Sequence, residues 1–352
     1  MAKSKTKRIN VALQGGGAHG AFTWGVLDRF LDEENLEIDG ISGTSAGALN
    51  GAAYKSGWLD GGREGARSNL DWLWNRMGAL RDLHGMPWLS NMTAAFTPSP
   101  AMTSATLDYS LPYAMLDATS RVVSPYAMGP FYKNPLVDVA EEFRFDKVCS
   151  HDGPRLYIGA TNVRSGKIRV FTHDEITPDA LLASACLPEM FQAIEIYDPA
   201  TERKEAYWDG GYSGNPALFP LFGKSLPDDI IVVNINPIHR EDLPVTPQQI
   251  ANRVNEISFN SSLLRELRAI AFVQRLIDDG KVTKGAMKRV NVHMVADDAL
   301  MNALSVATKL LPQPALLLQL KQKGRDAADR FLAQNWDALN SRSTVDLAEM
   351  LN

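Results

Sequence analysis

The 352-residue sequence lacks the features that define several large classes of protein. It has only two cysteines, Cys149 and Cys186, which lie far apart and outside any C-x-x-C spacing. Neither a disulfide framework nor a cysteine-based metal site is therefore expected, and a reducing compartment is favoured. No run of about 18 apolar residues occurs, so no segment is expected to span a bilayer. The net charge of −5 gives no reason to expect nucleic acid as a partner.

The first ten residues, MAKSKTKRIN, are basic, but the run VALQ behind them is too short for the apolar region of a signal peptide. We therefore expect a cytoplasmic protein and leave peripheral contact with a membrane open. The composition is 45% hydrophobic and 22% charged, which is typical of a globular protein that can bury a large core.

Strand-like and helix-like segments alternate along most of the chain. Short apolar runs predict strands, and apolar residues at helical spacing predict helices. Strands are expected at 8–14, 36–42, 228–236 and 288–296, a hairpin at 155–172, and helices from Gly20 and at 45–57, 248–279, 298–310 and 315–339. The helix at 45–57 is expected to end at Gly57, because glycine is common just after a helix. Such alternation is typical of an α/β layered sheet.

Residues 83–135 interrupt this alternation, because they are rich in proline, methionine, alanine and aromatic residues. The segment is expected to be either an irregular insertion packed on the core or a lid or apolar surface beside the active site. Together with the leucines of 310–320, it could dock on a lipid surface or bury an interface between subunits. Both interpretations stay open at this point.

Two glycine motifs overlap after the first expected strand, in the stretch VALQGGGAHGAF. Gly15, Gly17 and Gly20 form G-x-G-x-x-G, the fingerprint of dinucleotide-binding folds. Gly15, Gly16 and Gly17 also form a run that can present backbone N–H groups to a developing oxyanion. The loop alone does not distinguish a cofactor's pyrophosphate from the oxyanion of an ester under attack.

A second motif, Gly43-Thr44-Ser45-Ala46-Gly47, lies between the second expected strand and the helix that follows. This G-x-S-x-G pattern at a strand–helix junction is typical of a nucleophile elbow, in which a sharp turn exposes the serine hydroxyl. Ser45 would also lie at a helix N-terminus, where the helix dipole favours negative charge. Each glycine motif alone is a weak signal, but the two in order at strand–helix junctions are a stronger one.

The dinucleotide interpretation requires an acidic residue about 20 positions beyond the glycine motif, at the end of the second strand. Glu37 and Asp39 lie near that distance, but they precede the end of the strand, which is occupied by the serine motif. An oxyanion-binding loop is therefore favoured. A Rossmann-type doubly wound sheet is kept as the alternative fold, and no cofactor is expected.

A serine nucleophile needs a base to accept its proton. A Ser-Asp-His order would favour His239 or His293, although neither lies in a distinctive motif. Asp209 is better marked, because Gly210 and Gly211 follow it in a turn that the backbone can approach closely. From the residues alone, the identity of the base stays open.

Taken together, these segments resemble the patatin-like phospholipase family. The glycine loop, the serine motif and Asp209-Gly210-Gly211 match its three motifs in order, and ASACLPEMF (183–191) resembles its Ala-Ser-x-x-x-Pro segment. The resemblance covers 9–222 and implies a patatin-like domain there, with the strands and helices of 223–352 completing or capping the same α/β domain. The fold that it implies has three layers, with a mostly parallel sheet flanked by helices.

The resemblance also implies the chemistry of the site. Ser45 would be the nucleophile and Asp209 the base of a dyad without histidine, and no metal would be required. The N–H groups of Gly15, Gly16 and Gly17 would bind the oxyanion. The chain departs from the family at His19, where the family usually has arginine or lysine, so the contribution of that cation is in doubt here.

The expected function is hydrolysis of a lipid or other acyl-ester substrate by a phospholipase A or lysophospholipase type of enzyme, through an acyl-enzyme. One alternative is an esterase for soluble or storage-polymer esters on the same dyad. Another is a non-catalytic lipid-binding or scaffold protein. None of the motifs specifies the head group, the acyl position or the oligomeric state.

Overall fold

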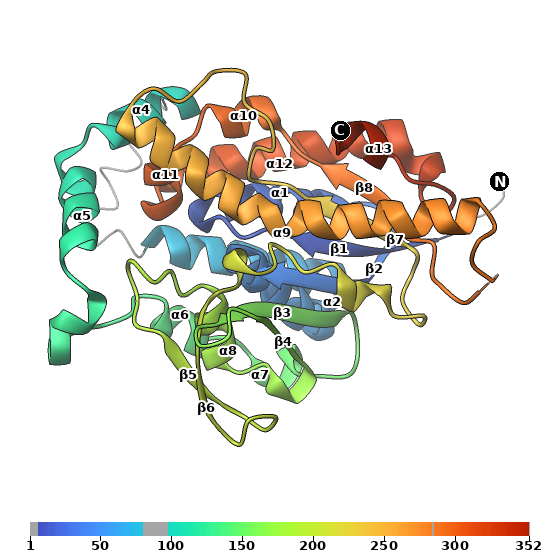
Figure 1. The fold of residues 1–352 in the computed structure, drawn as a ribbon, viewed down its shortest axis with the longest axis horizontal. Helices are drawn as coiled ribbons and strands as arrows, with labels where there is room; N and C mark the ends of the chain where they lie inside the picture. The colour runs from blue at the N-terminus through green and yellow to red at the C-terminus, as the bar shows by residue number, and fades with distance from the viewer. Residues whose placement is uncertain (1–5, 80–97, 284, 352) are drawn as a thin grey trace.

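A mixed eight-stranded sheet runs through the middle of the molecule (Figure 1). The computed structural model describes residues 6–79, 98–283 and 285–351. The strands are β1 (Lys7–Leu13), β2 (Leu36–Thr44), β3 (Arg155–Asn162), β4 (Ile168–Thr172), β5 (Ile194–Asp198), β6 (Arg203–Asp209), β7 (Asp229–Val233) and β8 (Asn291–Val295). Their order is β5-β6-β3-β2-β1-β7-β8, with β4 also paired to β3. Strands β3, β2, β1, β7 and β8 are parallel, whereas the β3–β4, β3–β6 and β5–β6 pairs are antiparallel.

Helices of very different length connect these strands. The α-helices are α1 (Gly20–Phe30), α2 (Ala46–Ala79), α4 (Pro100–Asp108), α5 (Leu111–Val122), α6 (Val137–Glu141), α7 (Phe145–Val148), α8 (Pro178–Ser184), α9 (Pro247–Asp278), α10 (Asp298–Asn302), α11 (Val306–Leu310), α12 (Pro314–Asn335) and α13 (Leu347–Met350). The 3-10 helices are η1 (Gly17–His19), η3 (Pro125–Phe131), η4 (His173–Glu175), η5 (Gly210–Tyr212), η6 (Phe219–Phe222) and η7 (Trp336–Ala338).

Helices cover both faces of the sheet, so its central strands are apolar and buried along their length. Successive side chains of a strand point to opposite faces. In β7, Ile231 and Val233 accordingly belong to a core shared with α1, α2 and α12, whereas Ile230 and Val232 belong to one shared with α9 and α13. Figure 1 shows α9 lying across the face of the sheet nearest the viewer. The three-layer, mostly parallel α/β fold expected from the sequence is confirmed.

The antiparallel strands were not all predicted. The hairpin expected at 155–172 is present as β3 and β4, but the hairpin of β5 and β6 was missed. These antiparallel strands depart from the parallel, doubly wound sheet kept as the alternative. The prediction that a helix ends at Gly57 is wrong, because α2 continues to Ala79 through a break at Gly61 and Gly62. Gly57 instead allows close packing, since a Cβ there would lie 2.3 Å from the carbonyl oxygen of Gly65.

The segment 83–135 is largely helical where it is described, because it forms α4, α5 and η3, and residues 80–97 lie outside the described part of the chain. Leu107 and Tyr113 are buried and pack with Ala307 of α11. Large apolar side chains of the same segment are exposed, namely Met102, Tyr109, Leu111, Met115, Val122 and Tyr126. The segment therefore packs on the core with one part and presents apolar surface with another.

Among the residues that the structure describes, no helix has both the length and the apolar character needed to span a membrane. The leucines of 310–320 are interrupted between α11 and α12, in agreement with the prolines in that stretch.

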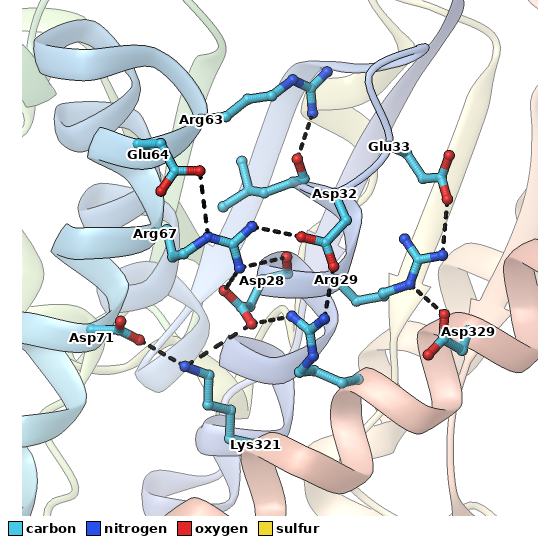
Figure 2. Close-up of polar contacts among 12 residues, drawn as sticks. Asp28, Arg29, Asp32, Glu33, Arg63, Glu64, Arg67, Asp71, Lys321 and Asp329 are labelled. Atoms are coloured by element: carbon cyan, nitrogen blue, oxygen red, sulfur yellow. Dashed lines mark hydrogen bonds and ion pairs between the residues drawn. The ribbon is translucent and has the colours of Figure 1, made fainter.

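A cluster of charged side chains joins α1, α2 and α12 on one face of the sheet (Figure 2). Asp28 and Asp32 each accept hydrogen bonds from both Arg67 of α2 and Arg325 of α12. The two arginines lie 2.7 Å from the carboxylate of Asp32, and the side chain of Asp28 is only 4% exposed. Removing one partner of a buried ion pair is costly, because the other charge is then left buried and unpaired. The cluster therefore fixes the three helices relative to one another.

Replacing Asp28 by asparagine should destabilise the fold, because Arg67 and Arg325 would lose a buried anionic partner. We expect Asp28→Asn to lower the free energy of unfolding by about 2–4 kcal/mol, somewhat below the cost of breaking a fully buried pair because both arginines keep contact with water. Urea denaturation followed by circular dichroism measures the change. The control is Glu64→Gln, whose side chain is 84% exposed and 3.8 Å from Arg67. An equal loss in both variants would contradict the structural role of Asp28.

Candidate active site

Ser45 lies in a tight turn between the end of β2 and the start of α2. Its φ of 53° is in the left-handed region, which residues other than glycine rarely adopt. A residue outside the turn stabilises it. The N–H of Ser45 donates to Oγ of Ser184 (2.9 Å), and the Ser184 hydroxyl donates to the carbonyl of Gly159 (2.7 Å). Ser184 belongs to the segment 183–191, so this segment supports the serine turn.

Two close approaches fix the serine turn against the end of β1. A Cβ on Gly15 would lie 2.7 Å from Cβ of Ser45, and a Cβ on Gly47 would lie 2.1 Å from the carbonyl oxygen of Leu13. A side chain at either position would push the glycine loop and the serine turn apart. The other motif glycines, which are Gly20, Gly43, Gly210 and Gly211, are also buried.

Asp209 is the last residue of β6 and pairs with Ala160 of β3. Its side chain is buried; Oδ1 accepts a hydrogen bond from the N–H of Gly211 (2.7 Å), and Oδ2 has no hydrogen bond of good geometry. Burial raises the pKa of Asp209 to about 7, against the opposing effects of the Gly211 N–H and the Ser45 hydroxyl. The structure thus brings Ser45 beside a carboxylate that can accept a proton near neutral pH.

The glycine loop offers two free N–H groups rather than the three expected. The N–H of Gly15 donates to Oδ1 of Asn215 (2.6 Å), and the carbonyl of Gly15 accepts from Nδ2 of Asn236 (2.8 Å). The N–H of Gly15, one of the three expected oxyanion donors, is thus already hydrogen-bonded in this structure. Within the described chain, the N–H groups of Gly16 and Gly17 have no acceptor, and both residues line the same cavity as Ser45 and Asp209.

This cavity has a volume of about 620 Å³ and an apolar wall. Its size is in the range of cavities that bind small organic ligands. Apolar side chains from several layers line it, including Leu49, Leu73, Trp74, Met77, Tyr113, Leu136, Leu187, Met190, Phe191, Phe259, Leu310 and Leu311. Such a wall suits an apolar ligand, and Ser45 and Asp209 are among the polar residues of the lining.

The two histidines considered as bases lie elsewhere. His239 is exposed and lies 3.2 Å from Glu241. His293 is enclosed in β8, between Oδ1 of Asp229 (2.9 Å) and Oγ1 of Thr344 (3.0 Å). Among the described residues that line the cavity there is no histidine. The dyad arrangement is therefore the one that the geometry favours.

His19 carries no charge at neutral pH, because burial and the nearby Lys309 lower its pKa well below the usual value. Its Nε2 is 2.8 Å from Oγ1 of Thr308. A cation is nevertheless present beside the glycine loop, because Lys309 of α11 lines the cavity. The backbone of Lys309 is close to the loop: a Cβ on Gly17 would lie 2.4 Å from the carbonyl oxygen of Lys309. Lys309 lies far from every motif, so no sequence pattern pointed to it.

This chain matches one sequence family and resembles a solved structure. A family model described as patatin-like phospholipase matches residues 11–221. Among solved structures, VipD from Legionella pneumophila is similar, with 14% sequence identity and a TM-score of 0.42 over 94% of this chain and 69% of VipD. No match was found among curated protein sequences. Because the family model covers more than half of the chain, this protein belongs to the patatin-like phospholipase family, and membership implies a lipid acyl hydrolase.

Proposed function

We propose that this protein hydrolyses acyl esters of lipids with a Ser45–Asp209 dyad. The observation that carries the proposal is the pairing of a serine hydroxyl with a buried carboxylate that has no cationic partner among the described residues. A carboxylate is a poor base for serine at its ordinary pKa, so the raised pKa of Asp209 is the property that the reaction needs. Oδ2 of Asp209 accepts no well-aligned hydrogen bond from the described residues. Hydrogen bonds between catalytic groups are often poorly aligned in enzymes without substrate and shorten when substrate binds.

In the first half of the reaction, Oγ of Ser45 attacks the acyl carbonyl carbon while its proton passes to Oδ2 of Asp209. The carbonyl oxygen becomes an oxyanion, which accepts hydrogen bonds from the N–H groups of Gly16 and Gly17. The positive end of the α2 dipole at Ser45 favours the same negative charge. Collapse of the intermediate transfers the proton from Asp209 to the leaving alcohol and leaves an acyl group on Ser45.

In the second half, Asp209 takes a proton from water as the water attacks the acyl carbon. The second tetrahedral intermediate collapses, the fatty acid leaves, and Ser45 recovers its proton from Asp209. The apolar cavity favours acyl chains of lipids over the soluble or storage-polymer esters considered as alternatives. Rates measured on esters of increasing chain length separate these substrate classes.

Removing either member of the dyad should abolish most of the activity. We expect Ser45→Ala and Asp209→Asn each to lower kcat by about 10³-fold or more, and the double variant to lose little beyond the single ones, because the pair acts as a unit. Hydrolysis of 4-nitrophenyl esters and analysis of lipid products measure the effect. The exposed Asp242→Asn serves as the control, since Asp242 lies in a loop outside the cavity.

A fluorophosphonate should add covalently to the wild type at Ser45 and not to Ser45→Ala, as mass spectrometry of the intact protein and its peptides would show. Turnover by Asp209→Asn close to that of the wild type would remove Asp209 from the dyad. Labelling at another serine would remove Ser45 as the nucleophile.

The pH dependence of the reaction should follow the ionisation of Asp209. Because only the carboxylate accepts a proton, kcat/KM should rise with pH to a plateau, with a midpoint near the pKa of about 7. The raised pKa also has a consequence for stability: the folded state binds this proton more tightly than the unfolded state, so stability is lost as the pH rises from the ordinary value of 3.8 toward 7.

Calorimetry tests the predicted loss of stability with rising pH. Asparagine stays neutral at every pH, so Asp209→Asn should raise Tm at pH 8 and raise it less at pH 5. A flat activity profile from pH 5 to 8, or a Tm gain that does not depend on pH, would contradict the assigned pKa.

We also propose that the apolar surface of α4 and α5 docks on lipid. Tyr109 and Leu111, beside the cavity-lining Tyr113, are 90% and 72% exposed. Burying such side chains in a membrane contributes about 1.5–3 kcal/mol each. The pair Tyr109→Asp with Leu111→Asp should therefore weaken co-sedimentation with phosphatidylcholine vesicles at least about tenfold. Failure of the wild type to sediment would contradict docking.

The control for this pair uses apolar side chains that are exposed elsewhere on the molecule. Phe272 and Met287 are 52% and 50% exposed and do not line the cavity. Phe272→Asp with Met287→Asp should leave co-sedimentation unchanged. An equal loss in both double variants would indicate non-specific adsorption.

A further inference from the structure

Among the described residues that line the cavity, one carries a partly buried ammonium group that the dyad does not use. Lys309 lines the cavity together with Ser45 and Asp209. Its Nζ donates to Oδ1 of Asn236 (2.8 Å), and Nδ2 of Asn236 donates to the carbonyl of Gly15 (2.8 Å). The ammonium therefore lies beside the glycine loop, close to the place where an ester would be bound for attack.

The charge of Lys309 is not neutralised by an ion pair within the described residues. The nearby carboxylate of Glu256 is held by Arg240 at 2.6 Å and by Arg253 at 3.3 Å. Three cations thus accompany one carboxylate, and of these four side chains only Lys309 lines the cavity. Lys309 is therefore the one of these three cations that a ligand in the cavity can contact, and it shares the lining with the acidic side chains of Asp209 and Glu189.

Lys309 also has protons available for a ligand. Its hydrogen bonds go to Asn236 and, at 3.5 Å, to Oδ1 of Asn255, whereas an ammonium carries three protons. Burial lowers its pKa to about 8, so most molecules carry the charge at pH 7. A partly buried charge without an ion-pair partner among the described residues costs free energy, and an anionic ligand at this point would offset that cost.

An amide of α9 extends the same polar patch. Asn255 lines the cavity, and its Nδ2 donates no hydrogen bond within the described chain. Asn252, one turn earlier, also lines the cavity, and its Oδ1 is buried without a partner. The lining of this mostly apolar cavity thus includes an ammonium and an amide, whose N–H groups are donors that a phosphate oxygen accepts from.

We propose that Lys309 and Asn255 form an anion subsite that binds the phosphate of a glycerophospholipid while its acyl ester lies at Ser45. The subsite selects phosphate-bearing esters over neutral acylglycerols. This inference rests on the proposed function, because it places the ester at Ser45. In this chain Lys309, and not the neutral His19, supplies the cation at the glycine loop.

The test compares two substrates that differ only in the phosphate-containing head group, dihexanoylphosphatidylglycerol and dihexanoylglycerol, both below their micelle concentrations. Lys309→Met should lower kcat/KM for the phospholipid at least tenfold more than for the neutral lipid, mainly through KM. Lys309→Arg should recover part of this selectivity. The control Lys323→Met removes the same charge from an exposed position on α12 and should leave the selectivity unchanged.

Equal losses on both substrates would overturn the proposal, because Lys309 would then only support the glycine loop. If Lys309→Met left the selectivity unchanged while Ser45→Ala abolished both activities, the anion subsite would fall and the proposed function would stand. If Ser45→Ala kept both activities, the proposed function would fail, and a binding measurement would decide on the subsite.

Calorimetry supplies that binding measurement without turnover. The Kd of dihexanoylphosphatidylglycerol for the Ser45→Ala protein should rise at least tenfold when Lys309→Met is added. An unchanged Kd would overturn the subsite. Glycerol 3-phosphate should compete only weakly; competition as strong as that of the lipid would show that the site takes a free phosphate ester and would overturn the assignment to a lipid head group.

Discussion

A direct backbone contact between the glycine loop and the serine turn holds the site together. The neighbouring parallel strands β1 and β2 end at the same edge of the sheet, so the segments that leave them pass close to one another. Gly15 has no room for a side chain beside Ser45, and Gly47 has none beside Leu13. Ser45 and the N–H groups of the glycine loop are therefore fixed relative to each other, and in the proposed reaction this removes the cost of reorganising them.

Carboxylates in this protein behave differently according to the partners that the fold gives them. Asp32 is partly buried, which alone would raise its pKa, but hydrogen bonds from Arg325 and Arg67 hold that pKa below its ordinary value. Asp209 is buried with one backbone N–H and a serine hydroxyl instead of arginines, and its pKa rises. The first arrangement makes a structural ion pair, and the second gives Asp209 the property that a base needs in the proposed reaction. A charged neighbour at Asp209 would stabilise the fold and weaken the proposed chemistry.

The sequence predicted the parts of the site that depend on local geometry. Ser45 and Gly47 were found because a strand, a turn and a helix follow one another within one short segment. The contacts of Ser184 with Ser45 and the position of Lys309 were missed, since they join residues far apart in the chain and leave no local pattern. The hairpin of β5 and β6 was missed for another reason. Its two strands are short and contain several charged residues, so no apolar run marks them in the sequence.

Strand β7 lies beyond the residues matched by the family model, yet it pairs with β1 in the centre of the sheet. Every residue of β7 and most of β1 is buried. Without β7, β1 would become an edge strand, with unpaired backbone groups and apolar side chains on both faces, and such edges recruit strands of other chains. By supplying β7, the last third of the chain covers the edge of β1, the strand that leads into the glycine loop, and so prevents aggregation through that edge. Because it also supplies Lys309, substitutions there can retune the cavity while the three motifs stay intact.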